Sequence, residues 1–102
     1  MRFPAGLYQI RNLKNGRTYI DINSNLDAIW NRHQAQLRFG SHPNADLQRD
    51  WIEQGASTFL FEILELIDTD DLTVSQINHD LKLLKSLYLD TVDKGSLYNI
   101  DG

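Results

Sequence analysis

The chain has 102 residues, of which 41% are hydrophobic, with a formal net charge of −4 and no cysteine. This length allows one domain with a single core, and the absence of cysteine excludes disulfides and thiolate metal ligands. The apolar stretch at 59–67 is interrupted by Glu62 and Glu65 and is far shorter than the roughly 20 residues that a membrane span needs. We therefore expect a single domain over residues 1–102, a cytoplasmic setting and no contact with a membrane.

The charge is unevenly distributed along the chain. Residues 1–49 hold seven basic and three acidic residues, a net of +4, whereas residues 50–102 hold three lysines and eleven acidic residues, a net of −8. Affinity for phosphate comes largely from Lys and Arg, so the first half could face a nucleic-acid backbone. An ordinary solvated surface explains the same charges. The candidate nucleic-acid-binding residues are Arg17, Arg32, Arg38, His42 and Arg49.

The first predicted elements are a β-hairpin and two helices. Residues 6–10 and 18–22 alternate in polarity around the turn signal Asn15-Gly16, a pattern that predicts two antiparallel strands. Apolar side chains then recur at helical spacing until Gly40, which ends a first helix. Asn44 can cap a second helix that Gly55 ends. The apolar positions of the two helices are Leu26, Ile29, Trp30, His33 and Leu37, then Leu47, Trp51 and Ile52.

The second half predicts one strand and one helix. The dense apolar content of residues 58–67 indicates a third strand in a central position, covered on both faces. A polar break at 68–71 precedes a last helix over about 72–90, with a buried stripe, and a short terminal segment at 97–100. The stripe consists of Ile77, Leu81, Leu84 and Tyr88. The order ββααβα, with a further edge segment, predicts an α+β fold in which helices flank a small antiparallel three-stranded sheet.

Two tripeptides on the hairpin suggest a family. Gly6-Leu7-Tyr8 and Tyr19-Ile20-Asp21 are separated by ten residues, which resembles the paired motifs of the GIY-YIG nuclease superfamily, with Asp in place of the second Gly. The remaining pattern is similar to the branch that includes phage homing endonucleases. Further matching positions are Asn12, Asn15-Gly16, Asn25-Leu26, 30–33, 37–42, Asn44, 47–51, Gly55, 59–65 and 98–99.

This resemblance implies hydrolysis of DNA phosphodiesters with one divalent metal ion. In the family scheme a hairpin tyrosine helps to activate the attacking water, an arginine on the first helix contacts the phosphate, and a glutamate on the last helix binds the metal. Phosphoryl transfer depends mainly on positioning and charge neutralisation, which an arginine and a metal supply.

Three of the implied site residues are retained. Tyr8 and Tyr19 match the motif tyrosines, and His33 matches a family histidine that could polarise water or touch phosphate. Each of these residues also has a structural interpretation. The tyrosines could pack in the sheet and use their hydroxyls as hydrogen-bond anchors. His33 could equally be a hydrogen-bonded core residue. His42 also fits the pattern, in a loop where capping and substrate contact are equally plausible.

Three other positions depart from the family. Ile29 stands where the family has its arginine, and an arginine finger contributes about 10³ to 10⁵ to phosphoryl-transfer rates. Lys85 falls at the glutamate position, where an ammonium repels a divalent cation. Asp21 replaces the second motif glycine, and we expect its carboxylate to pair with Lys85. No metal ligand is assigned.

Compensating residues for these losses are few. Arg32 and Arg38 lie further along the first helix, where neither reaches the arginine position without a shifted substrate. If the register of the last helix differs, Asp80 is the best carboxylate, with Asp90 behind it and Asn78 as a weak ligand.

The sequence thus supports three interpretations. The first is a catalytically impaired or inactive GIY-YIG homologue retained as a DNA- or protein-binding module. The second is an active endonuclease with a migrated site, using Mg²⁺ or Mn²⁺ and a carboxylate such as Asp80 or Glu65. The third is a protein-interaction domain whose acidic second half binds a basic partner.

Overall fold

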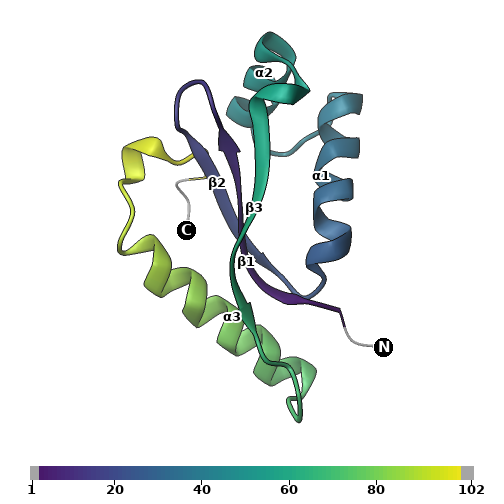
Figure 1. Cartoon of the computed structure of the whole chain (residues 1–102), viewed down its shortest axis with the longest axis vertical. Coiled ribbons are helices and arrows are strands. Elements are labelled where there is room, and N and C mark those ends of the chain that lie inside the picture. Colours follow the sequence, from purple (N-terminus) through teal and green to yellow (C-terminus); the bar gives the residue numbers. More distant parts are fainter. Residues whose placement is uncertain (1–2, 100–102) are drawn as a thin grey trace.

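Residues 3–99 are described by a computed structural model as a three-stranded antiparallel sheet with helices on both faces (Figure 1). Strand β1 (Ala5–Asn12) lies between β2 (Thr18–Asn23) and β3 (Phe59–Ile67). Helices α1 (Leu26–Phe39) and α2 (Ala45–Gln54) precede β3, and α3 (Val74–Leu89) follows it. The predicted α+β class and the order ββααβα are confirmed.

Local chemistry explains where the helices begin and end. The side chain of Asn25 accepts a hydrogen bond from the Ala28 N–H, and that of Asn44 accepts one from the Leu47 N–H. Gly40 ends α1 with a φ of 76°, a left-handed conformation that glycine adopts without strain. Thr73 and Gln76 form a reciprocal capping box, so α3 begins at Val74 instead of Leu72.

The prediction of a central third strand is wrong. β3 is an edge strand, and its Leu60, Ile63 and Leu66 are 41%, 50% and 58% exposed. The central strand is β1, because it alone forms ladders with both neighbours. At Gly6 of β1 a Cβ atom would collide with the backbone carbonyl of Glu65, so this motif glycine permits the close approach of β3.

The two faces of the sheet carry separate hydrophobic clusters. Figure 1 shows α1 and α2 on one face of the sheet and α3 on the other. Tyr8 and Ile10 pack in the cluster with α1 and α2, while Leu7 and Ile20 pack in the cluster with α3, as expected from the alternation of strand residues. Within the predicted stripe of α3 only Leu81 is fully buried, and the other three positions are half-buried. In α2, Ile52 is exposed instead of packed.

Two short 3₁₀ turns, η1 (Ala56–Thr58) and η2 (Lys94–Ser96), connect the elements. After η2 the chain returns to β2, where the Tyr98 N–H donates to the Thr18 carbonyl at 2.7 Å. The side-chain amide of Asn99 accepts from the Ile20 N–H and donates to the Ile20 carbonyl. The expected edge segment is therefore present at 97–99, and Ile100 lies outside the described residues.

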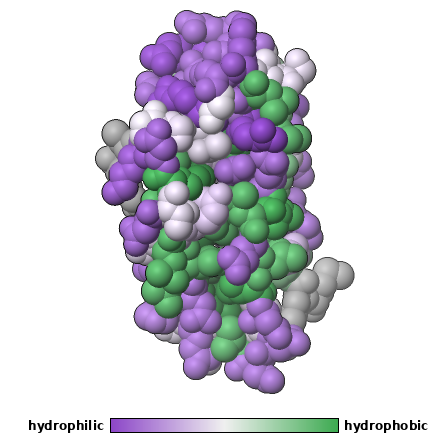
Figure 2. Space-filling view, turned by 60° about the vertical axis from the view of Figure 1, so that its left-hand side comes forward, coloured by the Kyte–Doolittle hydropathy of each residue, from purple (hydrophilic) through white to green (hydrophobic). Residues whose placement is uncertain are grey.

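The surface on the α3 side is mixed. Figure 2 shows a band of hydrophobic surface across the middle of this side, between hydrophilic ends. Leu83 and Leu87 of α3 are each more than half exposed. None of the helices within residues 3–99 has the length and apolar character required to cross a membrane.

Candidate active site

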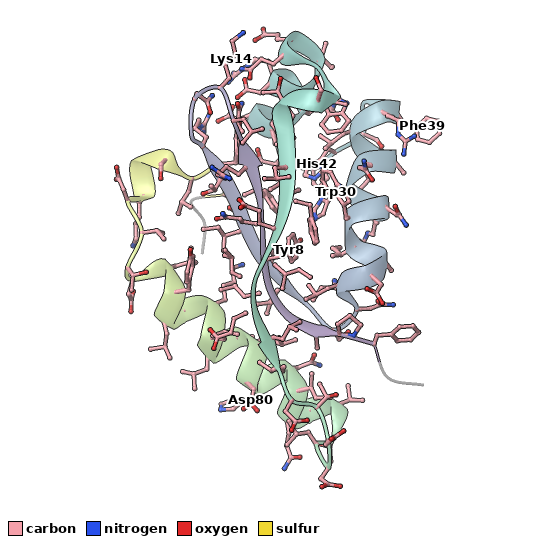
Figure 3. All side chains as sticks on the ribbon, in the orientation of Figure 1. Tyr8, Lys14, Trp30, Phe39, His42 and Asp80 are labelled. Carbon is pink, nitrogen blue, oxygen red and sulfur yellow. The ribbon has the colours of Figure 1, made fainter. Side chains whose placement is uncertain are left out.

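A small cleft lies between the β1–β2 hairpin and α1. Its volume is about 170 Å³, and it gathers both motif tyrosines with His33. Figure 3 shows Trp30 and His42 between the sheet and α1, with Tyr8 reaching toward the same layer from β1. The lining residues include Tyr8, Tyr19, Asp21, Ile29, Arg32, His33, Gln36 and Pro43.

A chain of hydrogen bonds runs from Tyr8 into the protein. The Tyr8 hydroxyl lies 2.7 Å from His33 Nε2, and His33 Nδ1 lies 2.8 Å from His42 Nε2. His42 Nδ1 in turn accepts the Asn44 N–H at 3.0 Å. The tyrosine and both imidazoles are buried, so each depends on the next for a partner.

The backbone amide of Asn44 sets the direction of this chain. Because it can only donate, neutral His42 carries its proton on Nε2 and donates to His33 Nδ1. Neutral His33 then carries its own proton on Nε2 and donates to the Tyr8 oxygen. The hydrogen of the Tyr8 hydroxyl is thereby left to point into the cleft.

Burial keeps the chain in this neutral state. It lowers the pKa of His33 to about 4, with a further contribution from His42, and it lowers the pKa of His42 as well. Burial also raises the pKa of Tyr8 and of Tyr19, and the nearby Asp21 carboxylate adds to both increases. At neutral pH Tyr8 is therefore a phenol that donates a hydrogen bond, and His33 presents an N–H to it instead of a base.

The residue predicted to stand at the family's arginine position is buried and apolar. Ile29 is 6% exposed and belongs to the core cluster beneath α1. Arg32, one turn further, lines the cleft from its exposed rim, and its charge opposes the rise in pKa of both tyrosines. Arg38 donates to the Gln34 carbonyl and is not part of the lining.

The predicted ion pair at the other end of the cleft is confirmed. Lys85 Nζ lies 3.1 Å from Asp21 Oδ1, and the two side chains are 19% and 31% exposed. The same Asp21 oxygen accepts the Ile22 N–H at 2.8 Å. Because β2 is an edge strand, Lys85 reaches from α3 around that edge to the cleft side.

The residues at this end do not fit a divalent metal ion. Such ions take carboxylate oxygens, and here one oxygen of Asp21 is held by an ammonium and an amide. Asp80 is exposed on the outer side of α3, away from the cleft (Figure 3). Glu65 is exposed on β3, and Glu62 accepts from Arg11 and Gln9. Within residues 3–99, no group of three or more His, Asp or Glu side chains is placed to hold a metal.

The candidate phosphate contacts are mostly engaged elsewhere. Arg17 pairs with Asp46 at 3.4 Å and stacks on Tyr98, with 4.3 Å from its guanidinium carbon to the ring centre. Arg49 lies 3.5 Å from Asp46 and 3.6 Å from the buried Asp50. His42 is buried behind His33, so Arg32 alone of the five candidates lines the cleft.

Two features of the site were missed from the sequence. The contact between His33 and His42 depends on the reversal at Gly40, which returns the chain after α1, and the left-handed glycine was the available signal. The Tyr98 hydroxyl donates to Asp50 at 2.6 Å and accepts from Asn12 at 2.9 Å. This second buried network ties the terminal segment to α2 and β1.

The hairpin, the paired tyrosines and the histidine on α1 define a nuclease-type α+β domain of the GIY-YIG class. No protein-family profile matches the chain. Over 83 residues, 80% of the chain, it is 34% identical to intron-associated endonuclease 1 of Enterobacteria phage T4. It covers 34% of that protein, so the chain spans about a third of the length of this relative.

Solved structures agree with this assignment. The catalytic domain of the homing endonuclease I-TevI is 32% identical, with a TM-score of 0.66 over 96% of this chain and 99% of the other. A variant of the same domain with one glutamate changed to alanine gives the same identity and TM-score over 94% of its length. The chain belongs to the GIY-YIG endonuclease family, together with the I-TevI catalytic domain.

Proposed function

We propose that this chain is a GIY-YIG homologue with an impaired active site that binds DNA without cutting it. The observation that carries the proposal is the 3.1 Å ion pair between Lys85 and Asp21 at the edge of the cleft. An ammonium in this place opposes the binding of a divalent cation and neutralises the nearby carboxylate. Hydrolysis that depends on one metal ion therefore loses its electrophile.

The buried Ile29 supports the same conclusion. A hydrocarbon at this position offers neither charge nor a hydrogen-bond donor to the negative charge that develops on a phosphate. Tyr8, in contrast, keeps a hydroxyl that is able to donate into the cleft. Binding of a phosphate group through Tyr8 and Arg32 does not require the missing functions.

One observation favours a second candidate, an active nuclease with a migrated site. Arg32 lines the cleft beside both tyrosines and could replace the lost arginine for a substrate seated further along α1. This candidate still requires a carboxylate that reaches the cleft. Asp21 provides one only if Lys85 moves away.

The first experiment measures binding and cleavage together. Duplex binding is followed by gel shift at several salt concentrations, and nicking of a supercoiled plasmid is followed with Mg²⁺ or Mn²⁺. We expect a salt-sensitive shift and no nicking. Nicking that Arg32→Ala abolishes would establish the second candidate instead. A protein that neither shifts DNA nor nicks it would leave only the interaction-domain interpretation.

Restoring the family residues tests why cleavage is absent. We expect Ile29→Arg, Lys85→Glu and Asp21→Gly together to nick the plasmid with metal present. The matched control adds Tyr8→Phe to the triple variant and should remove the gained activity. Circular dichroism must show that both variants fold, because the introduced guanidinium would enter a buried position. A folded triple variant without cleavage would mean that other residues also block the reaction.

A further inference from the structure

A groove separate from the tyrosine cleft gathers positive charge beside the β2 edge. It has a volume of about 520 Å³ and lies between α3, η2 and β2. Lys82, Lys85 and Lys94 line it together with Ser86, and the apolar lining comes from Ile22 and Leu89. These three lysines are all the basic residues of the acidic second half of the chain.

Within residues 3–99, two of the lysines have no ion-pair partner. Lys85 pairs with Asp21, but among residues 3–99 neither Lys82 nor Lys94 forms an ion pair. Among the described residues, Asp90 is the one carboxylate that lines the groove. Both free ammonium groups are exposed, so they can reach a ligand without first breaking an internal contact.

The groove continues from the cleft. Ile22 lines both hollows, and Asp21 of the cleft holds Lys85 of the groove. An extended anionic ligand seated at Tyr8 and Arg32 would therefore meet three further ammonium groups on passing the β2 edge. Lys82 and Lys85 are three residues apart on α3, which places their side chains on neighbouring turns about 5–6 Å apart at Cβ.

We propose that this groove, defined by Lys82, Lys85 and Lys94, binds backbone phosphates of the DNA duplex next to the part held in the cleft. The proposal rests on the DNA-binding function proposed above and adds the path of the duplex. Lysine is a compact charge with three rotatable donors, which suits phosphates that vary in position along a duplex. Contacts of this kind position nucleic acid and carry no base sequence information.

The nature of the occupant follows from continuity. An acidic protein segment would also suit three lysines, but the groove adjoins the cleft of a DNA-endonuclease family, and a nucleic-acid backbone presents phosphates to both. Lys85, which is predicted to stand at the position of the family's metal-binding glutamate, then contributes to phosphate binding. It extends the phosphate-binding surface across the edge where the family places its cation.

The test compares two variants with the same net charge. Lys82→Ala with Lys94→Ala lowers the charge by two units in the groove, and Lys14→Glu lowers it by two units at the exposed hairpin turn. Lys85 is left unchanged so that Asp21 keeps its partner. Affinity for a short duplex is measured by fluorescence anisotropy across a range of salt concentrations, with circular dichroism to confirm folding.

We expect the groove variant to lose about 1.8 from the slope of log K against log salt, near 0.9 for each phosphate contact removed. The groove variant should bind more weakly than the unchanged protein at 50 mM salt, and the ratio of their two affinities should fall about tenfold by 200 mM salt. Lys14→Glu should keep the original slope. These results together would support the groove as part of the DNA path.

The other outcomes each overturn the proposal in a recognisable way. If the protein binds DNA but the groove variant matches Lys14→Glu in slope and affinity, the groove is wrong and the proposed function stands. If the unchanged protein binds no duplex, both proposals fail. If polyglutamate shifts the backbone amide NMR signals of α3 and duplex DNA does not, the groove accepts an acidic protein instead.

Discussion

The two ends of the cleft are built in different ways. At the inner end, Tyr8, His33 and His42 are buried, uncharged and joined by hydrogen bonds of 2.7 and 2.8 Å. At the outer end, Asp21 and Lys85 are partly exposed and form an ion pair across the edge of the sheet. The inner end holds the tyrosine and histidine predicted to be retained, whereas the outer end holds the two residues predicted to replace a glycine and a glutamate of the family.

The difference teaches that the stability of the fold alone can explain why the residues of the inner end are retained. Tyr8 belongs to the core cluster, and His33 supplies hydrogen-bond partners inside it, so changing either would cost stability even in a protein that cuts nothing. Asp21 and Lys85 contact solvent, and exchange there costs little. The outer end therefore carries the clearer information about catalysis.

The largest effect is expected from breaking the inner end. His33→Ala leaves the Tyr8 hydroxyl and the His42 Nε2–H without their partner and opens a cavity in the core. We expect the free energy of unfolding to fall by about 3–4 kcal/mol in urea denaturation, because each buried unsatisfied group costs about 1–3 kcal/mol. His79→Ala, at an exposed histidine of α3, should change it by less than about 0.5 kcal/mol. A loss below about 1 kcal/mol for His33→Ala would show that the inner end is not structural.

Lowering the pH should lower the stability contributed by the inner end of the cleft, without any mutation. The folded protein holds the pKa of His33 at about 4, whereas an unfolded histidine titrates near 6.5. Between pH 4 and pH 6.5 the unfolded chain binds more protons than the folded protein. The stabilisation that neutral His33 contributes is therefore complete above pH 6.5 and is lost as the pH falls to about 4. The loss amounts to at most about 3 kcal/mol.

The measurement is the unfolding free energy in urea at pH 7.5 and at pH 5. His79→Ala should follow the unchanged protein, and His33→Ala should show a smaller dependence on pH. The hydrogen bond from Arg11 lowers the pKa of Glu62, so protonation of that carboxylate destabilises the fold only under more acidic conditions. Equal pH dependence in the His33→Ala variant would exclude His33 as the source.

The sequence predicted those elements whose limits depend on local chemistry. Gly40, Asn44 and Gly55 cap or end their helices as expected, because caps and turns involve neighbouring residues. Strand order depends on contacts far apart in the chain. The apolar β3 was therefore assigned to the centre, although β1, with its polar Gln9, occupies that place.

The site was predicted unevenly for a related reason. The pairing of Asp21 with Lys85 followed from opposite charges at two positions that the family motif brings together. The lysine groove was not expected, since Lys82 and Lys94 look like ordinary surface residues in an acidic half, and only the packing of α3 and η2 beside β2 brings them together. Arg17 and Arg49 were counted as phosphate contacts, but the fold pairs them with acidic residues.

The smallest effect on stability is expected at the outer end. Lys85→Met removes the ammonium but keeps a side chain of similar length, and we expect it to lower the free energy of unfolding by less than about 1 kcal/mol, since a partly exposed ion pair contributes little. A double-mutant cycle with Asp21→Asn, repeated at high salt, measures the coupling directly. A coupling above about 2 kcal/mol that persists in salt would mean that the pair is needed for the fold, and its presence would then say nothing about catalysis. A weak, salt-sensitive coupling would mean that the stability of the fold does not explain the presence of Lys85. The effect of its ammonium on the electrostatics of the cleft would then be the explanation to test.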